Sequence, residues 1–145
     1  PSHGGGLEKA FIKFLDRDAE VERFLKINES GHSFAIIFYV RKDGLMATYR
    51  PDFIVATADK VYLIETKGDD KVDDVNVRQK QTATIEWIKK INALEPEDRM
   101  NRTWEYVFIG ESVFYSLSGS GATITDICNQ CKVSYSVATG NLFDM

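Results

Sequence analysis

Several features that define other protein classes are missing from this chain of 145 residues. It has no apolar run approaching the ~18 residues that a membrane helix needs. It also shows no signal peptide with basic, apolar and small-residue regions. We therefore expect an intracellular, cytoplasmic protein that does not associate with membranes.

Cysteine and histidine are scarce, with two residues of each. Cys128 and Cys131 form a lone C-x-x-C, and neither a second pair nor a histidine follows at the spacing of a zinc site. Two reduced thiols are the expectation. His3 and His32 belong to no recognisable nucleophile arrangement and are interpreted as surface residues.

A positive charge balance is also missing, since the net charge is −4 and the pI is near 5.2. This argues against a protein that holds nucleic acid over its whole surface by neutralising phosphates. A local basic cleft is still compatible with the composition, and candidate cations for it are Arg41, Lys42, Arg50, Lys67, Lys71, Arg78 and Lys80.

No phosphate-binding G-x-x-x-x-G-K-[ST] loop is present, and Gly4-Gly5-Gly6 does not follow a strand. Residues 1–6 are expected to be a flexible linker. At 43% hydrophobic residues, the rest of the chain can bury one core. We expect a single domain over residues 7–145, with a core over about 7–110 and a helical extension over about 111–145.

The periodicity of apolar residues predicts helices and strands in a mixed order. Helices are expected from Leu7 to Leu15, from Ala19 to Ile27, from about Val75 to Leu94, and in short pieces at 111–117 and 123–128. Strands are expected at 34–40, at 45–56 with an interruption near Pro51, at 61–67 and at 104–109. This order indicates a mixed α/β domain with one central sheet flanked by helices.

Two carboxylates fall at the same end of a predicted hairpin, one on each strand. If its strands pair about a turn at Ala58-Asp59-Lys60, Asp52 lies opposite Glu65. Because side chains alternate along a strand, Lys67 projects to the same face as Glu65, and Thr66 projects to the other. An ammonium is thus expected beside two acids at the end of a buried strand.

Such a set of groups suits metal-dependent phosphodiester hydrolysis. Mg²⁺ prefers carboxylate, carbonyl and water oxygens, which Asp52, Glu65 and the backbone carbonyl of Thr66 can supply, and Mn²⁺ can substitute. Lys67 would orient or help deprotonate the attacking water. Glu8, near the start of the first helix, is the best candidate for a further carboxylate.

The long predicted helix carries polar residues that can assist this site. They can contact a phosphate or order the lysine, and the sequence does not distinguish among their positions. They are Arg78, Gln79, Lys80 and Gln81.

The pair Pro51-Asp52 followed by Glu65-Thr66-Lys67 resembles the motif of the PD-(D/E)xK nucleases. The surrounding sequence resembles the C-terminal endonuclease domain of the Res subunit of type III restriction enzymes. The likeness covers roughly the first two thirds of the chain and is carried by Leu7–Phe11, Tyr49–Val55, Leu63–Gly68 and Lys80–Trp87.

This resemblance implies a restriction-endonuclease-like core, a mostly antiparallel and then mixed sheet flanked by helices. It also implies Mg²⁺-dependent cleavage of double-stranded DNA by a bacterial or archaeal protein. The implied partners are a helicase-like motor domain of the parent subunit and a modification or specificity subunit. ATP would act only through the motor, which this chain lacks.

Two alternatives remain at this stage. The domain can be a non-catalytic DNA-binding or docking element with the same fold, or a repair or recombination nuclease of the same superfamily. The presence of Asp52, Glu65 and Lys67 together favours an enzyme, because a scaffold does not need all of them.

Overall fold

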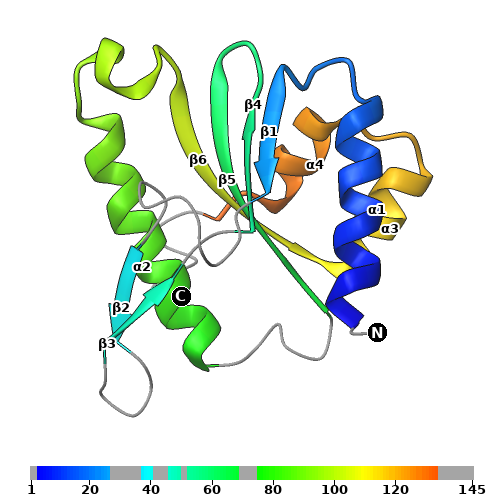
Figure 1. Cartoon of the computed structure of the whole chain (residues 1–145), viewed down its shortest axis with the longest axis horizontal. Coiled ribbons are helices and arrows are strands. Elements are labelled where there is room, and N and C mark those ends of the chain that lie inside the picture. The colour runs from blue at the N-terminus through cyan, green and yellow to red at the C-terminus, as the bar shows by residue number, and fades with distance from the viewer. Residues whose placement is uncertain (1–2, 27–36, 41–45, 50–51, 69–74, 134–145) are drawn as a thin grey trace, which may run out of the picture.

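A computed structural model describes residues 3–26, 37–40, 46–49, 52–68 and 75–133 (Figure 1). In chain order its elements are α1 (His3–Arg17), β1 (Arg23–Lys26), β2 (Ile37–Val40), β3 (Met46–Tyr49), β4 (Phe53–Ala56), β5 (Lys60–Lys67), α2 (Val75–Asn92), the 3-10 helix η3 (Pro96–Arg99), β6 (Thr103–Gly110), α3 (Glu111–Gly119) and α4 (Ile124–Cys131). Within these ranges, no helix is both long enough and apolar enough to cross a membrane.

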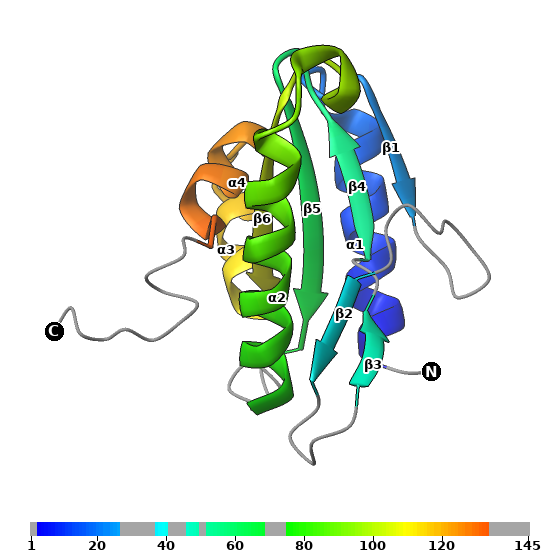
Figure 2. The ribbon, with the colours of Figure 1, turned by 90° about the vertical axis from the view of Figure 1, so that its left-hand side faces the viewer.

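The main sheet has four strands in the order β1-β4-β5-β6. The first three pair antiparallel, and β5 pairs with β6 in parallel. The predicted mixed α/β class is therefore confirmed. The predicted central sheet flanked by helices is confirmed as well, but β2 and β3 do not join it and form a separate two-stranded sheet against α2 (Figure 2).

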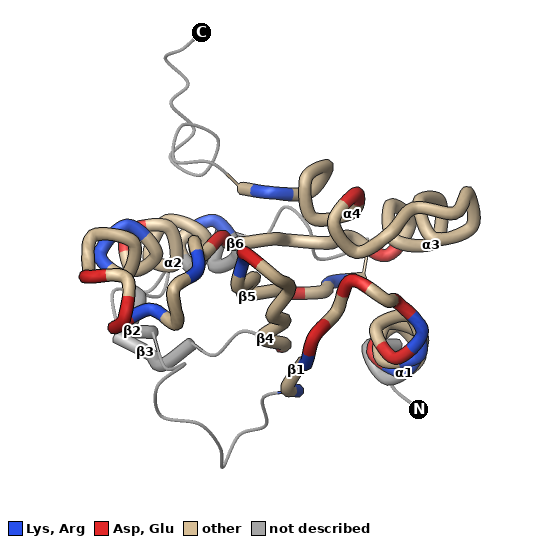
Figure 3. The backbone as a smooth tube through the Cα atoms, turned by 90° about the horizontal axis from the view of Figure 1, so that it is seen from above, with Lys and Arg blue, Asp and Glu red and all other residues tan. Residues whose placement is uncertain are grey.

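Helices cover both faces of the main sheet, with α2 on one side and α1, α3 and α4 on the other (Figure 3). A hydrophobic core lies on each face of the sheet, and β5 contributes side chains to both because they alternate between the faces. Tyr62 and Ile64 pack with Phe11 of α1, whereas Val61 and Leu63 pack toward α2. The buried strand predicted around residues 61–64 is thus the centre of the fold.

The helix predicted from Ala19 to Ile27 is wrong, since the structure forms strand β1 there. Its apolar residues fit a helical stripe, but so short a pattern does not distinguish a helix from a strand. Pairing with the backbone of β4 is what makes this segment a strand. Arg23 pairs with Ala56, and Lys26 with Phe53, so β1 satisfies hydrogen-bonding groups along that edge of β4.

Other boundaries differ in smaller ways. Helix α1 begins at His3, so residues 3–6 are helical rather than a flexible linker. The interrupted strand predicted at 45–56 becomes β3 and β4, which belong to different sheets. The positions of Arg41, Lys42, Arg50, Lys71 and His32 lie outside the described residues.

Candidate active site at the end of the central hairpin

The β4–β5 hairpin has the register that the sequence predicts. Phe53 pairs with Ile64, and Ala56 pairs with Val61. Asp52 precedes Phe53 as Glu65 follows Ile64, which brings the two acids to the same end of the hairpin. The backbone N–H of Asp52 continues the pairing by donating to the Ile64 carbonyl at 3.0 Å.

Asp52 is fixed to the end of β5 by Thr66. The backbone N–H of Thr66 donates to Asp52 Oδ2 at 2.9 Å, and the Thr66 hydroxyl donates to the same oxygen at 3.2 Å. These bonds orient the carboxylate without using a charged partner. The predicted role of the Thr66 carbonyl as a metal ligand stays a prediction.

The carboxyl group of Asp52 is in an environment that disfavours its ionised form. Burial raises its pKa from the ordinary 3.8 to about 6, although the hydrogen bond from the Thr66 backbone opposes the rise. The negative charges of Glu65 and Glu8 raise this pKa further, whereas Lys67 lowers it. A cation bound here would relieve the repulsion.

Glu65 and Lys67 lie side by side, as the alternation of β5 predicts. Glu65 is buried, with 3% of its surface exposed. Its Oε2 lies 3.2 Å from Lys67 Nζ, and its Oε1 accepts a hydrogen bond of 3.3 Å from the Tyr106 hydroxyl. The buried carboxylate is thereby compensated by an ammonium and a neutral donor.

Glu8 approaches from α1 on the other face of the sheet. Its Oε1 lies 3.2 Å from Lys26 Nζ in β1, and that ammonium also lies 5.8 Å from the centre of the Phe53 ring. Within the part of the chain that the structure describes, no three acidic, histidine or cysteine side chains gather closely enough to hold a metal ion. The negative charge of Glu8 raises the pKa of Asp52, and its carboxylate pairs with Lys26. Its role as a further carboxylate of the site stays a prediction.

The four polar residues of α2 differ in their surroundings. Arg78 is exposed, whereas Gln79 and Gln81 are half-buried. The side chain of Lys80 lies outside the described part of the structure. Gln79 Oε1 is buried and has no hydrogen-bond partner among the described residues. Their contribution to the site stays a prediction.

Sequence reasoning missed Tyr106 and Lys26. Tyr106 is almost fully buried in β6, where the parallel register pairs it with Leu63. A buried tyrosine usually places its hydroxyl on a polar partner, which was a usable signal. The sequence did not identify that partner, because the β5–β6 register is not set by a short turn.

The two cysteines lie on α4, which contributes none of these groups. Cys128 is buried in the core beside α1, and Cys131 is half-buried, and both are free thiols. Burial raises the pKa of each thiol, so both are protonated at neutral pH. They agree with the expected pair of reduced cysteines.

No protein-family model and no curated protein match the chain. Among solved structures, it is similar to the small subunit of the heterodimeric restriction endonuclease R.BspD6I. The identity is 12% and the TM-score is 0.43, with 97% of this chain and 88% of the other covered.

Proposed function

We propose that this chain is a metal-dependent DNA endonuclease domain that hydrolyses phosphodiester bonds. The observation that carries the proposal is the arrangement at the end of β5. Asp52 is anchored on Thr66, and the buried Glu65 pairs with Lys67 at 3.2 Å. Two acids and an ammonium at one strand end form a set suited to phosphate chemistry.

The donor set fits a divalent cation such as Mg²⁺ or Mn²⁺. Asp52 and Glu65 would hold it with the Thr66 carbonyl, and Asp52 Oδ1 is the oxygen that we assign to it, because Oδ2 accepts both bonds from Thr66. The raised pKa of Asp52 supports this, since burial and neighbouring acids leave its negative charge poorly compensated. When bound, the cation supplies charge compensation for the phosphate and makes water more acidic.

Lys67 is the group that we assign to the reacting phosphate. Its ammonium lies 3.2 Å from Glu65 Oε2 and can donate hydrogen bonds to the attacking water and to phosphate oxygens. In the reaction, the water oxygen bonds to phosphorus while one ester P–O bond breaks; the water loses a proton to solvent, and the leaving oxygen takes one up from solvent. Tyr106 keeps Glu65 in place during this step through its hydroxyl.

The larger context is also part of the proposal. We assign the domain to the cleavage module of a type III restriction enzyme Res subunit, acting on double-stranded DNA with a motor domain and a specificity subunit. The sequence resemblance of Leu63–Gly68 and Tyr49–Val55 supports this assignment. We further assign residues 7–145 to one domain in the cytoplasm.

Incubation of supercoiled plasmid with the purified chain tests the activity. Nicked and linear products should form with Mg²⁺ or Mn²⁺ and should be absent with EDTA. A structure determined with Mn²⁺ gives an independent readout, since anomalous density is expected between Asp52 and Glu65. Density elsewhere, together with undiminished cutting in EDTA, would contradict the proposal.

A further inference from the structure

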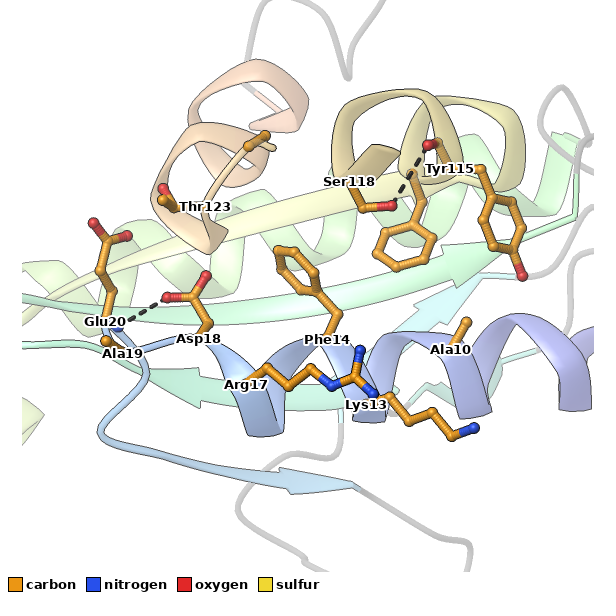
Figure 4. Close-up of a pocket in the computed structure, with 12 residues that line it drawn as sticks. Ala10, Lys13, Phe14, Arg17, Asp18, Ala19, Glu20, Tyr115, Ser118 and Thr123 are labelled. Atoms are coloured by element: carbon orange, nitrogen blue, oxygen red, sulfur yellow. Dashed lines mark hydrogen bonds between the residues drawn. The ribbon is translucent and has the colours of Figure 1, made fainter. Parts of the chain in front are cut away.

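An open groove of about 700 Å³ lies between α1 and α3, and none of its lining residues belongs to the candidate active site. Phe14 of α1 and Phe114 of α3 meet in it edge to face, with ring centres 5.7 Å apart. Tyr115 extends from α3 toward α1 and is 45% exposed (Figure 4). Phe114 is buried, so the rings that the groove presents to solvent are those of Tyr115 and the half-buried Phe14.

One rim of this groove is basic. Lys13 and Arg17 lie one helical turn apart on α1 and are both exposed, and Lys9 extends the same row by one more turn. The helical rise sets these cations about 6 Å apart along the axis. In a chain of net charge −4, this row forms a local positive patch that attracts negatively charged groups.

Acidic residues also line the groove, but they are engaged by α4. Asp18 accepts a hydrogen bond of 2.7 Å from the Ile124 N–H, and Glu20 accepts one of 3.3 Å from the Thr125 N–H. Both N–H groups belong to the first turn of α4, where the helix dipole favours negative charge. The negative charges of Asp18 and Glu20 are therefore partly compensated by α4.

We propose that this groove binds a single-stranded segment of DNA. An exposed aromatic surface beside a row of cations is the combination that single-strand binding uses, because unpaired bases stack on rings while phosphates contact lysine and arginine. Tyr115 and Phe14 would receive a base, and Lys13 and Arg17 the adjoining phosphates. The choice of DNA over other polyanions rests on the proposed endonuclease function.

Fluorescence anisotropy of a labelled oligothymidylate, recorded in EDTA over a series of salt concentrations, tests the groove without cleavage. Tyr115→Ala should weaken binding about tenfold, whereas Tyr115→Trp should retain it, because stacking needs a ring. Replacing both Lys13 and Arg17 by Ala should reduce the slope of log affinity against log salt by about 1.4. The matched control replaces Lys89 and Lys90, two exposed lysines of α2, by Ala and should bind as the wild type does.

Equal competition by duplex DNA, by free thymidine monophosphate or by an acidic polypeptide would overturn the proposal, as would unchanged binding by the groove variants. Failures of the two proposals are distinguishable. If the oligothymidylate binds as described but plasmid is not cut with Mg²⁺, the endonuclease proposal fails alone. If plasmid is cut while the groove variants bind as the wild type does, the groove proposal fails alone.

Discussion

The hydroxyl of Tyr106 donates a hydrogen bond of 3.3 Å to Glu65 Oε1 across the parallel pair of β5 and β6. Both side chains are buried. The bond joins the candidate active site to a strand that lies far from it in sequence. It means that the carboxylate position depends on the packing of β6 as well as on the hairpin.

Tyr106→Phe should reduce cleavage about tenfold while the fold is retained. The variant keeps the ring but removes a hydrogen bond to a charged group, which is worth roughly 1.5 kcal/mol or more. Plasmid cleavage and the circular dichroism spectrum measure the two effects. Tyr62→Phe is the matched control, since Tyr62 is equally buried but faces α1, and it should cut normally. Equal losses in both variants would contradict a specific role for Tyr106.

Asp52→Asn should stabilise the protein at neutral pH when no divalent cation is present. The pKa of Asp52 rises from 3.8 unfolded to about 6 folded, so ionisation costs folding stability. This loss of folding free energy is absent below about pH 3.8 and grows as the pH rises toward about 6. Above that pH it reaches its full value of about 2–3 kcal/mol. Urea unfolding in EDTA should give the variant a larger free energy of unfolding than the wild type at about pH 7 and an equal one near pH 4.

The same variant tests the metal site. Mg²⁺ should raise the unfolding midpoint of the wild type, because a ligand bound only by the folded state stabilises it. Asp52→Asn should gain little from Mg²⁺ and should not cut DNA. Equal stabilisation of the variant and the wild type by Mg²⁺ would count against Asp52 as a cation ligand, whereas a variant less stable than the wild type in EDTA at neutral pH would count against the raised pKa.

Lys67→Met should reduce cleavage by at least about 100-fold, because the variant removes the ammonium from the reacting groups but keeps an unbranched chain of similar length. Single-turnover cleavage rates measure the effect. Lys89→Met supplies the control, since that lysine is exposed on α2 and its Nζ lies 3.8 Å from Glu86 Oε2, away from the candidate active site. Normal cutting by Lys67→Met would remove the lysine from the mechanism.

Phe11→Ala should destabilise the fold by about 3–5 kcal/mol, because a buried aromatic side chain is replaced by a cavity. Phe11 has no exposed surface, and the centre of its ring lies 4.9 Å from that of Phe53 and 5.6 Å from that of Phe114. Chemical denaturation measures the loss. Val113→Ala on the exposed face of α3 should change stability by less than about 0.5 kcal/mol.

The sequence by itself determined the features that depend on local spacing. The 3.6-residue period of Leu7, Phe11 and Leu15 predicted α1, and the turn at Ala58-Asp59-Lys60 predicted which residue of β4 faces which residue of β5. Alternation along β5 then placed Lys67 beside Glu65, as the distance of 3.2 Å confirms. These inferences held because turns and side-chain periods act over a few residues.

Tertiary structure decided what depends on distant segments. Residues 23–26 became a strand because the edge of β4 was available to pair with them. That same strand places Lys26 where it pairs with Glu8. Tyr106 contacts Glu65 because β6 pairs with β5 in a parallel register that no short turn sets. Backbone hydrogen bonds and charge pairs between elements remote in sequence form only when the whole chain packs. The sequence therefore identified Asp52, Glu65 and Lys67, whereas their contacts with other side chains depend on the tertiary structure.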